Sequence, residues 1–177
     1  MDRENENPGG TSPSSVRLLG ETPREHADAA YRAHHPEPTV LLLMRFGGSA
    51  VLRGIDAGVR SAGARFGRDV VRADDRDYTG ELWANVALCL HNSDLVVAVL
   101  EEIDGRCDAN VMVELGFALS SGRRCLILVE HRRPALPTVL RHRLTREFDA
   151  YDVPGSVQTQ VEDWFRRDLG LVERHDA

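Results

Sequence analysis

The segments LVVAVL at residues 95–100, DANVMVELGFA at residues 108–118 and CLILV at residues 125–129 decide the fold of this chain. The first and third are continuous apolar runs of strand length, and the middle one has the length and apolar content of a packed helix. A strand, a loop, a helix and a second strand in this order predict a parallel crossover unit. We therefore expect Asn110 and Glu114 at or near the carboxyl end of a parallel sheet, where open α/β sheets bind their ligands.

The same alternation continues on both sides of this unit. Apolar runs predict strands at residues 39–46, 68–73, 95–100, 124–129 and 148–151. Helical spacing predicts helices at residues 25–34, 51–64, 80–92, 110–121 and 156–169, with a helical turn at 138–144. Gly122 is the expected C-cap of the fourth helix, and Gly155 or Ser156 the expected N-cap of the last. The pattern predicts one α/β domain over residues 36–172, a doubly wound, mostly parallel sheet in a flavodoxin-like or Rossmann-like sandwich.

Residues 1–25 differ in composition from the rest of the chain. They are rich in Asn, Pro, Gly, Ser, Thr and charge, and they have almost no clustered apolar residues. Such a segment buries too little apolar surface to offset its ordering entropy, so we predict a disordered tail. It has no apolar core of the kind a secretory signal needs, and no run in the chain has the length of a membrane span. We expect a cytoplasmic protein with no membrane partner.

Charge and residue usage exclude some classes of chemistry. The net charge is −6, which argues against nonspecific nucleic-acid binding. The chain has no Lys, so a Schiff-base lysine is impossible, and any phosphate contact must use Arg or backbone N–H groups. Cys89 and Cys125 fit buried thiols, whereas Cys107 is either an inert loop thiol or a reactive one. The histidines lack metal-ligand spacing, so we expect no metal and no cofactor.

Two loops after predicted strands offer candidate ligand contacts. The turn after the first strand contains Phe46, Gly47 and Gly48; its glycines either let the backbone approach a phosphate or simply form the turn. Arg72 and Asp74 close the second strand, where an acidic residue either binds a ribose hydroxyl or is a solvated loop charge.

Glu114 is the sharpest candidate for chemistry. One interpretation is that Glu114 is an ordinary glutamate on the exposed side of a helix. However, its neighbours are apolar: Val111, Met112, Val113, Leu115 and Phe117. A closely packed helix rarely contains a carboxyl group, because burying the charge is costly, so Glu114 indicates a function. Together with Asp108 it could be a carboxylate of tuned pKa.

The segment from Asn110 to Ala118 resembles the signature of nucleoside 2-deoxyribosyltransferase-like proteins and their TIR-like relatives. Three further features follow in the family's order: the apolar first strand from Val40 to Phe46, Arg72-Ala73-Asp74 after the second strand, and Ser93-Asp94 before the third. The late Phe148-Asp149-x-Tyr151 is also similar, so the likeness spans residues 39–152. The Asn-Val-x-x-Glu-Leu-Gly element is the most specific of these.

The resemblance implies N-glycosidic chemistry on a nucleoside, a nucleotide or NAD. It makes Glu114 the nucleophile on the anomeric carbon and Asp108 the carboxylate that assists the base or a sugar hydroxyl. It also implies a homo-oligomer. The expected substrate contacts are Phe46, Gly47, Gly48, Arg72, Asp74 and Asn110.

The chain departs from the family at two places. Arg45-Phe46-Gly47-Gly48 stands where transferases have a Tyr or a small-residue-Gly-Pro pattern, and Leu100-Glu101-Glu102 replaces an Asp-Leu-Thr run. Hydrolysis, transfer and substrate therefore stay open. The alternatives are a non-catalytic nucleotide-sensing module in a bacterial signalling or defence system, and a protein–protein interaction domain; the fold alone does not choose among them.

Overall fold

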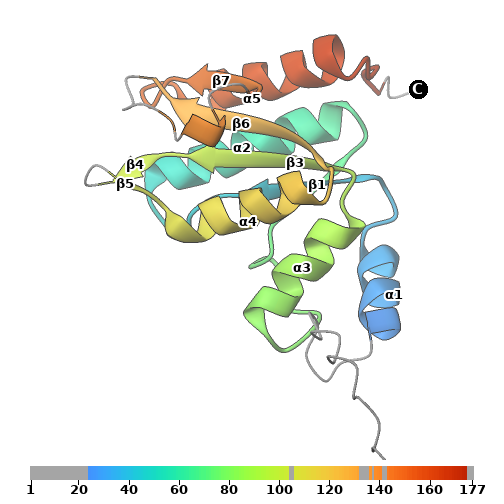
Figure 1. The fold of residues 1–177 in the computed structure, drawn as a ribbon. Helices are drawn as coiled ribbons and strands as arrows, with labels where there is room; N and C mark the ends of the chain where they lie inside the picture. Colours follow the sequence, from blue (N-terminus) through green and yellow to red (C-terminus); the bar gives the residue numbers. More distant parts are fainter. Residues whose placement is uncertain (1–23, 104–105, 132–135, 137, 141–142, 175–177) are drawn as a thin grey trace, which may run out of the picture.

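Five parallel strands form the central sheet in the order β2-β1-β3-β6-β7 (Figure 1). The structure is a computed structural model that describes residues 24–103, 106–131, 136, 138–140 and 143–174. The strands are β1 (Thr39–Leu43), β2 (Asp69–Val71), β3 (Leu95–Leu100), β6 (Arg124–Glu130) and β7 (Thr145–Phe148). The order reverses between β1 and β3, as in flavodoxin-like sheets, so the switch point for a ligand lies at the carboxyl ends of these two strands.

Helices cover both faces of this sheet (Figure 1). One face carries α2 (Ala50–Arg65), α5 (Val153–Asp163) and the π-helical turn η2 (Trp164–Asp168), and the other carries α1 (Arg24–His34), α3 (Leu82–Asn92) and α4 (Ala109–Ser120). Alternate residues of β1 enter two separate apolar cores: Val40 and Leu42 face α2 and α5, and Leu41 and Leu43 face the other three helices. Because β1 and β3 are buried on both faces, all their residues are apolar except Thr39. The predicted doubly wound α/β sandwich is confirmed.

The carboxyl-terminal part begins its elements earlier than predicted. The last strand is Thr145–Phe148 and not residues 148–151, because a half-exposed edge strand with Arg146 and Glu147 has no continuous apolar run. The last α-helix begins at Val153, with Asp152 at the N-cap position, and not after Gly155 or Ser156. Pro154 lies inside its first turn, where a missing N–H group costs nothing.

The loop predicted at residues 101–107 contains two short antiparallel strands, β4 (Glu102–Ile103) and β5 (Arg106–Cys107). Strands of two residues leave no periodic signal, so the sequence could not predict them. In Figure 1 this hairpin lies where β3 ends, next to the start of α4. The turn predicted at 138–144 contains a 3₁₀ turn, η1 (Thr138–Leu140).

Other predictions concern chain ends and turns. The C-cap of α4 is Ser121 and not Gly122; Gly122 is the next residue, and its φ of 73° is the left-handed conformation that commonly follows a helix end. Of the predicted disordered tail, residues 1–23 lie outside the described residues, while Arg24 and Glu25 already belong to α1. Among the helices of the described ranges, none has the length and apolar content to cross a membrane.

Candidate functional site

The ends of β1 and β3 are joined by an ion pair at the switch point. Arg45 follows β1, and its Nε donates to Oε1 of Glu101, which follows β3, over 2.7 Å. The Glu101 side chain is only 10% exposed and that of Arg45 is 32% exposed. Glu101 was not among the predicted site residues, although an acidic residue directly after a fully buried strand is a signal for this position.

The end of β2 carries a second, forked ion pair. Arg72 Nε and Nη2 donate to the two carboxylate oxygens of Asp74 over 2.8 and 2.5 Å. Arg72 Nη1 also lies 3.5 Å from the sulfur of Met44, just beyond β1. The structure therefore brings Arg72 and Asp74 together and ties the end of β2 to the end of β1.

Asp108 starts the helix that carries Glu114. Its Oδ1 accepts hydrogen bonds from the backbone N–H groups of Asn110 at 2.8 Å and Val111 at 3.3 Å, so Asp108 is the N-cap of α4. Asn110 is exposed in the first turn, and Glu114 follows four residues later on the same side of the helix. This structural role of Asp108 was not predicted from the sequence.

Glu114 is half-buried, and its pKa is raised to about 7. Burial is the main cause, followed by the negative charges of Asp108 and Asp74. These three carboxyl groups, predicted separately from α4 and from the loop after β2, are thus close enough to interact electrostatically.

The environment of Glu114 differs from that of the other buried glutamates. Glu101 is paired with Arg45, and Glu162 accepts from both Arg65 and Gln158. The carboxyl group of Glu114 makes no hydrogen bond or ion pair to any residue that the structure describes. A desolvated, unpaired carboxyl group surrounded by acids is costly for the fold, which is typical of functional sites.

The turn after β1 has one constrained and one open glycine. Gly47 has φ of 156°, and a Cβ there would lie 2.9 Å from Leu52 Cδ1, whereas a Cβ at Gly48 would meet no atom within 4 Å. Phe46 is 45% exposed beside them. Ser49 caps α2 by accepting from the Leu52 N–H group at 3.1 Å. Gly47 is therefore required by the turn, and Gly48 leaves space at the sheet edge.

We predict that Gly47→Ala destabilises the protein by about 1–3 kcal/mol, because the backbone conformation disfavours a side chain. Gly48→Ala should change the free energy of unfolding by less than about 0.5 kcal/mol, since its Cβ enters open space. Urea denaturation of both variants measures this. Equal stabilities would show that the turn is not constrained as described.

Substitutions of Asp108 separate its capping duty from its charge. Asp108→Asn keeps a good N-cap, so the stability should change little, whereas Asp108→Ala should cost about 1 kcal/mol. Both variants remove a negative charge and should lower the pKa of Glu114. Denaturation and a pH titration of Glu114 by NMR measure the two effects; an unchanged pKa in both variants would contradict the electrostatic contact.

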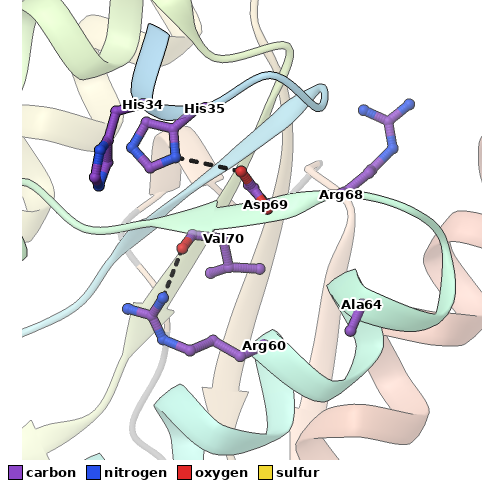
Figure 2. Close-up of a pocket in the computed structure, with 7 residues that line it drawn as sticks. All are labelled: His34, His35, Arg60, Ala64, Arg68, Asp69 and Val70. Atoms are coloured by element: carbon purple, nitrogen blue, oxygen red, sulfur yellow. Dashed lines mark hydrogen bonds and ion pairs between the residues drawn. The ribbon is translucent and has the colours of Figure 1, made fainter. Parts of the chain in front are cut away.

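Two described cavities lie away from this edge. One of about 390 Å³ is lined by residues around Asp69, at the start of β2 (Figure 2), and one of about 330 Å³ lies near Arg124, at the start of β6. Neither is lined by a residue predicted for the site. Within the described ranges, no three His, Cys, Asp or Glu side chains form a cluster that could hold a metal ion.

No protein-family model matches the chain, and no curated protein matches it. Among solved structures, it is similar to the 2-deoxyribosyltransferase of Bacillus psychrosaccharolyticus, with 13% identity, a TM-score of 0.46, and coverage of 70% of this chain and 95% of that one. A 2-deoxyribosyltransferase from Leishmania mexicana has 21% identity and a TM-score of 0.42, covering 55% of this chain and 67% of that one. A de novo designed Rossmann 2x3 protein has 15% identity and a TM-score of 0.42, covering 78% and 95%.

Proposed function

We propose that the protein cleaves or transfers the N-glycosidic bond of a nucleoside, a nucleotide or NAD, with Glu114 as the nucleophile. One observation carries the proposal: Glu114 is a half-buried carboxyl group with a pKa of about 7 and no bonding partner among the described residues. It lies on the helix that begins at the carboxyl edge of the sheet. The resemblance of residues 110–118 to the 2-deoxyribosyltransferase signature supports the same assignment.

The reaction follows from the chemistry of a carboxylate. The ionised Glu114 attacks the anomeric carbon, a carbon–oxygen bond forms, and the bond to the base nitrogen breaks with its electron pair going to the base. The departing base takes a proton, and Asp108 is the second carboxyl group proposed to assist. Water or a second base then attacks the anomeric carbon and releases Glu114. Negative charge beside the sugar stabilises the oxocarbenium-like transition state.

Substrate contacts are proposed from the same edge. The exposed ring of Phe46 offers a surface for a base, and the open space at Gly48 admits a sugar or phosphate. Asn110 adds an exposed amide, and the carboxylate of Asp74, held by Arg72, can accept from a ribose hydroxyl. The homo-oligomer remains a prediction.

One observation favours the sensing alternative. With a pKa of about 7, Glu114 is protonated in a large fraction of molecules at neutral pH, and a protonated carboxyl group is no nucleophile. A non-catalytic nucleotide-sensing module would tolerate this, since the neutral group can donate a hydrogen bond to a ligand. An enzyme would instead show base release that increases with pH through about 7.

The test is incubation with a panel of nucleosides, nucleotides and NAD, with free base followed by chromatography. The proposal expects release from at least one member. Calorimetry with the same panel provides the second readout. Saturable binding without any release of base would support the sensing module. If neither binding nor release is observed, the result would favour the protein–protein interaction domain.

A further inference from the structure

The two cavities described above differ in how their polar groups are paired. In the cavity of about 390 Å³, His35 contacts Asp69 over 3.4 Å, and Arg60 Nη1 donates to the Val70 carbonyl over 2.7 Å (Figure 2). Figure 2 also shows Arg68 directed away from the two histidines. Arg68 Nη1 is buried without a hydrogen-bond partner among the described residues, but it lies 3.7 Å from Oδ2 of Asp94. The other polar groups named here bond to residues of the same cavity wall, which fits a structural junction between α1, α2 and β2.

The cavity of about 330 Å³ lies at the amino edge of the sheet, opposite the edge where the strands end. Arg123 and Arg124 stand at the start of β6, and Arg143 and Leu144 stand just before β7. Further walls come from the end of α4 and from η2. The described residues that line it are Leu119, Arg123, Arg124, Cys125, Ile127, Arg143, Leu144, Trp164, Asp168 and Leu169.

Among the described residues, this cavity has an excess of positive charge. Its described lining has three arginines and one carboxylate, that of Asp168, which already accepts from Arg146 over 2.6 Å. Arg143 is exposed, and its side chain has no bonding partner among the described residues. Arg123 Nε is buried and has no hydrogen-bond partner among the described residues. Arg123 Nη2 donates to the His91 carbonyl over 2.7 Å, and Arg124 Nη2 donates to the Asp168 carbonyl over 3.4 Å, so neither guanidinium group is paired with a carboxylate among the described residues. In a chain with a net charge of −6, three guanidinium groups beside a single described carboxylate indicate an anionic ligand.

The remaining walls suit an apolar body. Leu119, Ile127, Leu144 and Leu169 are aliphatic, and Trp164 is only 2% exposed. Burial raises the pKa of the Cys125 thiol to about 11, so it is a neutral wall at physiological pH. A volume of about 330 Å³ is at the small end of ligand pockets, which fits a ligand of about one ring.

We propose that this cavity is a second ligand site, for a small organic phosphate that carries one apolar or aromatic ring. A phosphate monoester has three strong acceptor oxygens and nearly two negative charges, which matches several guanidinium groups better than a carboxylate does. The site lies at the opposite sheet edge from Glu114, so it is a place for an effector and does not depend on the proposed N-glycosidic reaction.

The test uses the intrinsic fluorescence of Trp164. The chain has two tryptophans, so Trp83→Phe leaves Trp164 as the single indole, at the wall of the cavity. Phenyl phosphate is the probe, and inorganic phosphate, benzoate and benzyl alcohol are the comparison ligands. Arg143→Gln removes a guanidinium group that has no bonding partner among the described residues, and Arg32→Gln, at an exposed arginine on α1, is the matched control.

We expect phenyl phosphate to change the Trp164 signal saturably, and to bind about tenfold or more tightly than each comparison ligand. Arg143→Gln should weaken it about tenfold or more, with an unchanged melting temperature, and Arg32→Gln less than about twofold. Three results would overturn the proposal: no saturable change, equal affinity for inorganic phosphate or benzoate, or equal affinity in Arg143→Gln. Calorimetric titration with phenyl phosphate checks that the signal reports binding.

Discussion

Glu114→Gln is expected to reduce base release by about a thousandfold or more while the protein stays folded, because an amide cannot act as the nucleophile. The substitution preserves the size and shape of the side chain, so ground-state binding of the substrate should change little. Rates of base release at saturating substrate, together with the Kd from calorimetry, measure this. Glu25→Gln, at an exposed glutamate of α1, is the control and should retain full activity.

The same variant should be more stable than the parent protein at alkaline pH. Since the folded-state pKa of Glu114 is raised from 4.5 to about 7, the proton is bound more tightly in the folded state. The stabilisation from this proton is complete below pH 4.5 and is lost as the pH increases to about 7. Glu114→Gln should therefore raise the free energy of unfolding by about 1–3 kcal/mol at pH 8, and by much less at pH 4. Urea denaturation at both pH values measures the difference; a destabilised variant at pH 8 would show that Glu114 has a structural partner.

Arg45→Ala is expected to lower the free energy of unfolding by about 2–3 kcal/mol. The loss leaves the Glu101 carboxylate, only 10% exposed, without its guanidinium partner. The magnitude stays below that of a fully buried pair because Arg45 is 32% exposed and water can partly replace it. Chemical denaturation at pH 7 measures the loss.

The matched control for Arg45→Ala is Arg174→Ala. Arg174 pairs with Glu37 over 3.2 Å, but both side chains are well exposed, at 58% and 44%. Its removal should cost less than about 1 kcal/mol. Adding Glu101→Gln to Arg45→Ala should recover part of the lost stability, because the buried charge is gone. Equal losses for the two arginine variants would contradict the electrostatic role of the switch-point pair.

The sheet could be predicted from the sequence because its central strands are buried on both faces. The apolar run at residues 95–100 matches β3 residue for residue, and residues 39–43 of the first predicted strand form β1. The glycine just after α4 could also be predicted, because glycine readily adopts the positive φ that Gly122 has there. In contrast, β7 is the edge strand, only its last residue, Phe148, is buried, and Arg146 and Glu147 interrupt the apolar pattern, so the sequence placed this strand wrongly.

Only part of the candidate site could be predicted from the sequence. The sequence indicated Glu114 through its apolar neighbours, and the structure adds that its charge interacts with those of Asp108 and Asp74. The sequence could not show that Arg45 and Glu101, 56 residues apart, form an ion pair, because the strand order decides which loops meet. Nor could it show that Asp108 caps α4, because capping depends on where the helix begins.

The most direct measurement is intact-mass spectrometry of the protein with a 2-fluoro analogue of whichever panel member releases base. The fluorine slows the second step by destabilising the oxocarbenium-like transition state, so a covalent intermediate should accumulate. The account predicts a mass increase equal to one fluorinated sugar residue, mapped by peptide analysis to Glu114 and absent in Glu114→Gln. A sugar attached to another residue, or base release that persists in Glu114→Gln, would contradict it.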